Sequence, residues 1–209
     1  MVKKKSEHLR VYLASMLLFV VAIIVAYNLG VTDYINDSIF MMLILTLLFF
    51  LYDGLRMTSW IYFSVAIAFL LHNLGMFGFY SVSPIFIQWD HVTHFFGELV
   101  AGVALYNMFY SYKVLNGKKT KTERFTILMV VVFAALGIGV IIEFMEFFGY
   151  LFVGEGLGIF AHGIGDVNTE FINSEWFNTM FDLIYNFLGA LFGVLLCHFG
   201  LNKKVFRKN

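Results

Sequence analysis

Cysteine, proline and charged residues are all scarce in this sequence of 209 residues. The single cysteine, Cys197, excludes an intrachain disulfide framework and a cysteine-rich metal site. The only proline, Pro84, lies between hydrophobic runs and interrupts none of them. Charged residues make up 13% of the chain, against roughly 25% in a soluble domain. The net charge is zero, so no overall field attracts nucleic acid, and we expect no nucleic-acid partner.

Apolar residues are in excess and make up 60% of the chain, which is typical of a protein whose solvent is lipid. We therefore expect an all-α, polytopic membrane protein that forms a single membrane domain over residues 1–209. Six segments are long and apolar enough to predict spanning helices, at about 11–29, 38–52, 57–80, 91–112, 125–149 and 178–201. The longest predicted connection is a loop over about 150–177, which we expect on the outer side.

The lysines and arginines predict the orientation of these spans. All 14 lie before the first span, after the last, or in the loops that follow the second and fourth spans. With six spans these regions share one side of the membrane, and the three remaining loops contain acidic but no basic residues. An excess of basic residues marks the cytoplasmic side. Both termini are therefore predicted to be cytoplasmic.

The fourth predicted span begins with closely spaced ionisable residues, which mark function by default because charge is expensive inside a bilayer. Asp90, His91, His94 and Glu98 fall on one face at 100° per residue, and His94 is one turn from both Asp90 and Glu98. A carboxylate and an imidazole at this spacing can chelate a metal ion or fix the tautomer of a general base. The alternatives are an interfacial position for Asp90 and His91 and a structural pair of His94 with Glu98.

The fifth and sixth predicted spans carry polar residues at a similar depth. Glu143 and Glu146 are one turn apart, and two carboxylates in an apolar helix repel unless a cation or a shared proton offsets the repulsion. Asp182 and Asn186 begin a stripe that continues as Gly-x-x-x-Gly, a spacing that lets a neighbouring helix approach closely. A role for Asp182 and Asn186 in helix packing is the alternative.

These positions predict one polar pocket near the outer ends of the helices. His72 in the third span reaches the same depth, although a lone histidine there is more simply interpreted as structural. In an enzyme, the expected catalytic residues are Asp90, His94, Glu143, Glu146 and Asp182, of which all but the last would also bind a metal ion. The expected substrate-binding residues are His72, His91, Glu98, Asp166 and Asn186.

The same motifs resemble those of the VanZ-like family of small membrane proteins. Asp90 and His94 match an aspartate and a histidine that open one helix, and Glu143 with Glu146 stands where the family often has Glu-x-x-Gln. Residues 182–193 match Asp-x-x-x-Asn-x-x-Gly-x-x-x-Gly position by position. The stretch 89–193 also resembles the YjdF-like (DUF2238) membrane proteins, which carry a Gly-x-Gly-Asp loop like residues 163–166. The resemblance implies a helical fold in a plasma membrane and a role in the cell envelope.

Three functions are compatible with these residues. The first is a non-catalytic protein whose pocket binds a lipid headgroup, an amphiphile or a partner, in contact with membrane lipids. The second is a metal-dependent enzyme that acts on a lipid-linked substrate from the outer side, for which Zn²⁺, Mn²⁺ or Fe²⁺ suits the mixture of oxygen ligands and imidazoles. The third is an ion- or proton-coupled transporter, which predicts polar residues continuing to the inner side; the inner half of the fifth span has no charge past Arg124.

Overall fold

The computed structural model describes residues 2–154, 158–160 and 174–201, and these residues form helices and turns without a strand. The all-α fold expected from the sequence is therefore confirmed. The α-helices are α1 (Val2–Leu29), α2 (Asp33–Phe50), α3 (Ser59–Asn73), α4 (Trp89–Ser111), α5 (Lys121–Phe152) and α6 (Ser174–Leu195). A 3₁₀ turn, η1 (Leu74–Phe77), extends α3, and a π-helical turn, η2 (Leu196–Leu201), extends α6.

Local capping sets several of these helix boundaries. Thr120 and Glu123 form a reciprocal capping box at the start of α5, with Thr120 Oγ1 accepting from the Glu123 amide at 3.1 Å and Glu123 Oε2 accepting from the Thr120 amide at 2.8 Å. Thr58 Oγ1 caps α3 by accepting from the Ile61 amide at 3.2 Å. Gly30, with φ +74°, follows the end of α1 in a left-handed conformation that favours glycine. Because the capping box starts α5 at Lys121, this helix begins four residues before the predicted start of its span at about residue 125.

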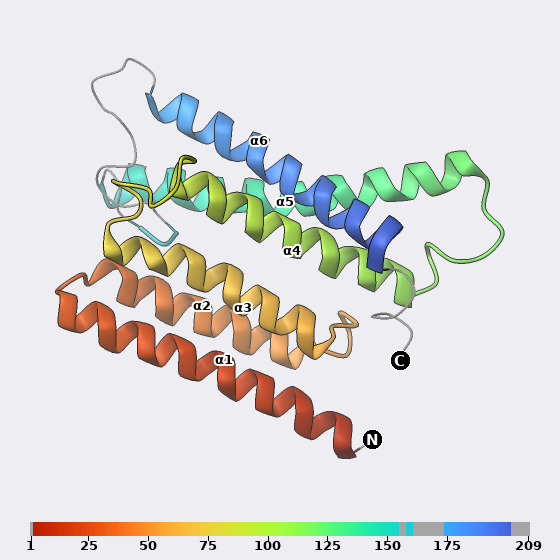
Figure 1. Ribbon diagram of the computed structural model, residues 1–209, viewed down its shortest axis with the longest axis horizontal. Helices are drawn as coiled ribbons and strands as arrows, with labels where there is room; N and C mark the ends of the chain where they lie inside the picture. The colour runs from red at the N-terminus through yellow and green to blue at the C-terminus, as the bar shows by residue number, and fades with distance from the viewer. Residues whose placement is uncertain (1, 155–157, 161–173, 202–209) are drawn as a thin grey trace.

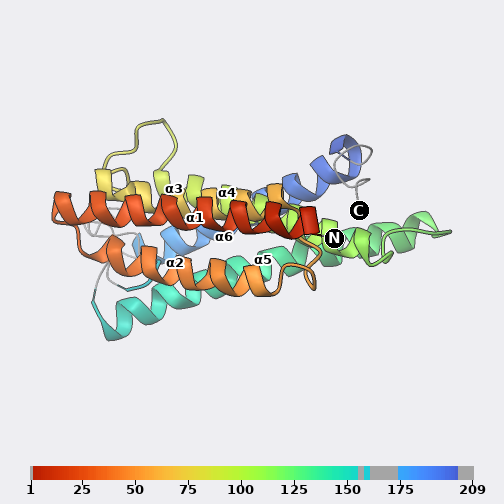
Figure 2. The same ribbon diagram turned by 90° about the horizontal axis from the view of Figure 1, so that it is seen from below.

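The helices run alongside one another in two groups, α1–α3 and α4–α6, and α3 packs against α4 (Figures 1 and 2). Within the part of the chain that the structure describes, five helical segments are long and apolar enough to cross a membrane: 6–29, 33–50, 59–77, 121–152 and 176–200. The chain is thus a multi-pass membrane protein by its composition. The α4 helix does not meet this measure because it carries the polar residues of the fourth predicted span, and it lies among α3, α5 and α6. Its crossing of the membrane, the single-domain organisation and the cytoplasmic termini stay predictions.

Two glycines on α6 bring that helix against the backbone of α4. A Cβ atom added at Gly189 would overlap the carbonyl oxygen of Phe95, and one added at Gly193 would overlap that of Leu99. At Gly102 on α4, an added Cβ would lie 2.8 Å from the Ala190 carbonyl oxygen. The close approach expected from the Gly-x-x-x-Gly spacing is present, and it carries the polar residues at the start of α6 to α4.

The second span begins earlier than the sequence analysis placed it. The α2 helix starts at Asp33, so Asp37, which was expected in an outer loop, lies one turn inside the helix and is only 2% exposed. The loop expectation was wrong because acidic residues are stabilised in the first turns of a helix and because a partner on α3 pairs with the Asp37 carboxylate. The first residues of the predicted 150–177 loop belong to α5, and its last residues belong to α6. Residues 155–157 and 161–173, which include Asp166, lie outside the described residues.

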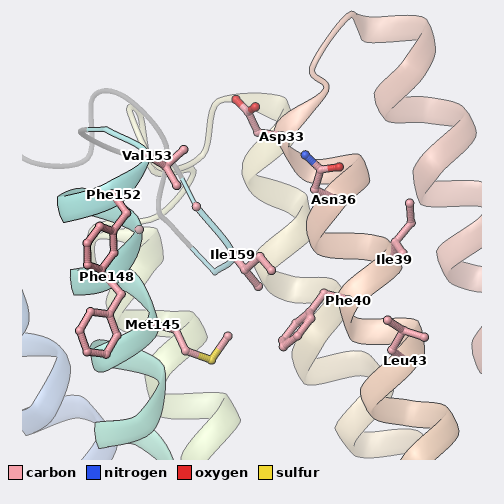
Figure 3. A pocket seen from close by; sticks show the side chains of 12 residues that line it. Asp33, Asn36, Ile39, Phe40, Leu43, Met145, Phe148, Phe152, Val153 and Ile159 are labelled. Carbon is pink, nitrogen blue, oxygen red and sulfur yellow. The ribbon is translucent and has the colours of Figure 1, made fainter.

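An apolar groove of about 790 Å³ separates α2 from α5 (Figure 3). Its walls are formed by Phe40 and Leu43 on α2 and by Phe148 and Phe152 on α5. Polar side chains lie at one end, where α2 begins. The complete lining consists of Asp33, Asn36, Ile39, Phe40, Leu43, Met145, Phe148, Gly149, Phe152, Val153, Gly158 and Ile159.

Candidate functional site

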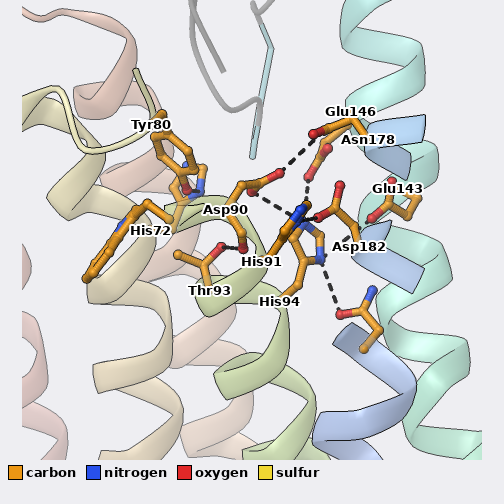
Figure 4. Close-up of polar contacts among 12 residues, drawn as sticks. His72, Tyr80, Asp90, His91, Thr93, His94, Glu143, Glu146, Asn178 and Asp182 are labelled. Carbon is orange, nitrogen blue, oxygen red and sulfur yellow. Dashed lines mark hydrogen bonds and ion pairs between the residues drawn. The ribbon is translucent and has the colours of Figure 1, made fainter. Parts of the chain in front are cut away.

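A polar cluster joins α4, α5 and α6 near the end of the bundle where α4 begins (Figure 4). We refer to it as the α4–α6 cluster, and its members are Asp90, His91, His94, Glu98, Glu143, Glu146, Asp182 and Asn186. All are buried except Glu146, whose side chain is 13% exposed. The structure thus brings together eight of the ten residues predicted for the pocket. The other two are Asp166, which is not described, and His72, which lies beside the cluster.

His94 occupies the centre of the α4–α6 cluster. Its Nε2 is 3.5 Å from Oδ1 of Asp90 and 3.7 Å from Oε1 of Glu146. Its Nδ1 is 3.6 Å from Oε1 of Glu143 and 3.2 Å from Oδ1 of Asn186. One imidazole therefore faces carboxylates from both α4 and α5, an arrangement that favours a positive charge at this position.

His91 forms the second imidazole contact, on the α6 side. Its Nδ1 lies 2.7 Å from Oδ1 of Asp182, and its ring stacks on Tyr185 with centroids 4.8 Å apart. Asn178 on the same helix donates from Nδ2 to Oδ2 of Asp90 at 3.4 Å. These contacts fix the orientation of the His91 ring and hold the start of α6 on α4.

The cluster contains more acidic groups than its imidazoles can neutralise. Five carboxyl groups surround the two histidines, and the sequence has no lysine or arginine between Arg56 and Lys113 or between Arg124 and Lys203. Every ion pair described within the cluster uses a histidine. Because an isolated buried carboxylate is strongly destabilising, the remaining charge must be offset by shared protons or by a bound cation.

Buried polar atoms without hydrogen-bond partners also indicate that the cluster binds protons or a cation. Within the described chain, hydrogen-bond partners are lacking for Glu98 Oε2, Glu143 Oε1, Asp182 Oδ2 and Asn186 Nδ2, all of which are inaccessible to solvent. A buried acceptor without a donor costs about 1–3 kcal/mol. Three of these atoms are carboxylate oxygens, the ligand type that hard cations prefer.

Two groups of described side chains within the cluster have ligand atoms close enough together to hold a metal ion. One consists of Asp90, His91 and Asp182, and the other of His94, Glu143 and Asp182; in each, one ligand atom per residue lies within 4.8 Å of the others. Ligands on opposite sides of a transition-metal ion are about 4 Å apart, since each metal–ligand distance is about 2.1 Å. Among the described residues, Asp90, His94 and Glu143 of the expected metal ligands belong to these groups and Glu146 does not; His91 and Asp182 complete the groups.

A second polar group lies on α2 and α3, and sequence reasoning did not find it. Nε2 of His72 is 2.8 Å from Oδ2 of Asp37, and Nδ1 of His72 is 2.6 Å from the Tyr80 hydroxyl. Burial raises the pKa of Tyr80 well above its ordinary value of 10. Because the Asp37 carboxylate only accepts, Nε2 of His72 carries the hydrogen in the neutral ring, and Nδ1 accepts from the Tyr80 hydroxyl. His72 is therefore not a lone histidine. We refer to Asp37, His72 and Tyr80 as the α2–α3 triad.

A cavity of about 60 Å³ connects the triad with the cluster. His72, His94 and Glu146 line it, together with Phe160, and its volume accommodates an ion or one to two waters. Phe160 also packs edge-on against Phe40 of the groove, with ring centroids 5.6 Å apart. Ile159 lines the groove and its neighbour Phe160 lines the cavity, so this short segment separates the two spaces.

These features define a class, multi-pass helical membrane proteins with a buried histidine–carboxylate site. A family model described as "Predicted membrane protein (DUF2238)" matches residues 8–203, nearly the whole chain, and the chain belongs to that family. The resemblance to the YjdF-like (DUF2238) proteins is thereby confirmed, whereas the resemblance to the VanZ-like family stays a prediction. Neither the curated proteins nor the solved structures contain a match.

Proposed function

We propose that this protein binds a divalent cation in the α4–α6 cluster and uses it to hold the polar end of a membrane amphiphile. The observation that carries the proposal is the set of five carboxyl groups around two imidazoles, at an end of the bundle where the sequence supplies no lysine or arginine. The orientation predicted from the basic residues places this end on the extracytoplasmic side.

A cation satisfies more of the cluster than shared protons do. Protons neutralise individual carboxyl groups, but a cation coordinates several oxygens at once and also engages imidazole nitrogen. Two of the unpartnered oxygens belong to Glu143 and Asp182, which are two members of one of the groups with ligand spacing. Mixed carboxylate and imidazole ligands favour Mn²⁺, Fe²⁺ or Zn²⁺ over Mg²⁺.

The groove between α2 and α5 supports an amphiphile as the ligand. Its volume of about 790 Å³ lies within the 300–1,000 Å³ typical of ligand sites, and its walls are almost entirely apolar. The described contacts of α2 are mainly with α1 and α3, and those of α5 mainly with α4 and α6, so the groove opens to the side between them. We assign it to a hydrocarbon chain, and in this proposal the polar end of the amphiphile passes Phe160 to reach the cavity beside the cluster.

A metal-dependent enzyme is the second candidate, and the α2–α3 triad favours it. His72 lines the same cavity as His94, and both of its ring nitrogens are held by hydrogen bonds. An oriented imidazole opposite a cation is an arrangement that general acid–base catalysis uses. Transport has less support, because about 13 Å of α4 separates Glu98 from the next buried side-chain amide, Asn107, at 1.5 Å per residue.

Manganese binding tests the proposal. Detergent-purified protein, stripped with a chelator, is titrated with Mn²⁺ while free Mn²⁺ is followed by electron paramagnetic resonance. We expect saturable binding that weakens at least about tenfold in Glu143→Gln, which removes one ligand charge while keeping the shape of the side chain.

Glu123→Gln is the matched control, since it makes the same chemical change on the same helix and preserves a capping-box residue type. It is expected to bind like the wild type. Wild-type protein with native helicity and no saturable Mn²⁺ binding would overturn the proposal, as would equal binding by Glu143→Gln.

A further inference from the structure

We infer that the α4–α6 cluster holds two divalent cations, bridged by the carboxylate of Asp182. The inference rests on the proposed cation site and specifies its nuclearity. In this arrangement Asp90 and His91 coordinate one cation, and His94 and Glu143 coordinate the other. The ligand groups come from three helices, so the pair of ions would also tie α4, α5 and α6 together.

The two ligand groups have one residue in common. Asp182 belongs to both, and the remaining members are different residues: Asp90 with His91 in one group and His94 with Glu143 in the other. His91 and His94 are three residues apart on α4, so each imidazole serves one group only. A single cation would use one of these groups and leave the other imidazole and its carboxylate uncoordinated.

The two oxygens of Asp182 have different surroundings, and one of them is left to ligate an ion. Oδ1 is 2.7 Å from Nδ1 of His91, whereas Oδ2 has no hydrogen-bond partner among the described residues. The Asp182 side chain is fully buried, so water does not satisfy Oδ2 from the surface. A carboxylate that gives one oxygen to each ion holds two metals about 3.5–4 Å apart, the spacing found in two-metal sites.

Charge favours two ions over one. The five carboxylates of the cluster, when ionised, contribute a charge of −5, and neutral imidazoles contribute none. One divalent cation leaves −3 in a buried site that has no lysine or arginine nearby, whereas two leave −1. The smaller residual charge is the less costly one to bury.

The packing of α6 on α4 places Asp182 between the two groups. Gly189 and Gly193 allow the two backbones to touch, and Asn186, one turn after Asp182, contacts Nδ1 of His94 at 3.2 Å. Asp182 consequently lies near His91 and His94 at once, while α5 supplies Glu143 from the other side (Figure 4).

Metal stoichiometry and magnetic coupling together test this inference. Protein equilibrated with Mn²⁺ and freed of excess ion is measured by elemental analysis and by low-temperature electron paramagnetic resonance. Two ions per chain with the spectrum of an exchange-coupled pair support the bridge. One ion per chain with an uncoupled spectrum overturns the inference but leaves the proposed cation site, and no bound ion overturns both.

Two variants and a control make the test independent of a single substitution. Asp182→Asn is expected to lose the coupled spectrum and to retain one ion or none. His91→Gln removes a ligand from one group only and is expected to retain one uncoupled ion. This variant therefore tests for two bound ions even if Asp182→Asn does not fold. Ile184→Leu, at an exposed position on the same helix, is expected to retain the coupled pair. A coupled pair in folded Asp182→Asn would overturn the bridge.

Discussion

Asp37 and His72 are 35 residues apart in the sequence, and Oδ2 of Asp37 lies 2.8 Å from Nε2 of His72. The contact joins α2 to α3, and both side chains are buried. The other oxygen of Asp37 accepts from the Phe160 amide at 3.2 Å. One carboxylate therefore holds the imidazole that lines the polar cavity and the segment that separates this cavity from the groove.

Replacing Asp37 by asparagine should destabilise the protein. The substitution removes the negative charge that His72 and the Phe160 amide contact, and breaking a buried charged hydrogen bond costs about 1–3 kcal/mol. The measurement is the unfolding temperature in detergent. Asp53→Asn, an exposed carboxylate in a turn outside the helices, serves as the control and should change stability little. Equal unfolding temperatures for the two variants would show that the contact between Asp37 and His72 contributes nothing to stability.

Gly189→Ala should separate α6 from α4. A Cβ at this position overlaps the Phe95 carbonyl oxygen, a backbone atom that cannot rotate away, so a loss of about 1–3 kcal/mol is expected from overpacking. Because Asp182 and Asn186 lie on α6, Mn²⁺ affinity should fall with stability. Gly137→Ala is the control, since its Cβ would meet nothing within 4 Å. Unchanged Mn²⁺ binding in Gly189→Ala would contradict a site that depends on this helix contact.

Tyr80→Phe should separate the role of the triad from that of the cluster. The variant removes the hydroxyl that donates to Nδ1 of His72 and leaves a buried acceptor, a cost of about 1–3 kcal/mol in stability. Mn²⁺ affinity should stay within about twofold of the wild type, because Tyr80 belongs to neither ligand group. Thermal unfolding and the Mn²⁺ titration measure the two effects. A large loss of Mn²⁺ affinity without a loss of stability would place Tyr80 in the cation site instead.

Leu43→Trp should fill the groove and reduce lipid binding. Leu43 lines the groove and is 63% exposed, whereas Leu47, one turn further along α2, is 57% exposed and lies outside it. Leu47→Trp is therefore a control with the same added bulk in a similar setting. Native mass spectrometry of protein titrated with phosphatidylethanolamine should show at least about threefold less bound lipid for Leu43→Trp, as expected when a chain of this size loses its site. Equal lipid binding by both variants would argue against the groove as a chain site.

Much of the fold could be predicted because its signals are local. Long apolar runs identify five helices that can cross a membrane, and the Gly-x-x-x-Gly spacing on α6 corresponds to the close approach at Phe95 and Leu99. The helix boundaries were less accurate because capping and turns decide them, as Thr120 does at the start of α5. The start of α2 at Asp33 had the largest consequence, since the predicted bounds of about 38–52 left Asp37 outside the span.

The cluster was predictable for a different reason. Asp90, His94 and Glu98 share one face of a helix by simple periodicity, and a charge in an apolar segment is conspicuous. The triad was not predictable because it joins two helices and a turn through contacts that no sequence spacing specifies. One signal was available: Asp37 continues the stripe of buried positions Met41 and Leu45 at intervals of four. The groove depends on how α2 and α5 are separated, which hydropathy does not report.

Anomalous diffraction from crystals grown with Mn²⁺ shows whether the α4–α6 cluster binds a cation. We expect anomalous density within the cluster, between the carboxylate of Asp182 and the imidazoles of His91 and His94. A well-ordered cluster whose carboxyl groups contact one another and the imidazoles, with no anomalous density among them at saturating Mn²⁺, would contradict this expectation.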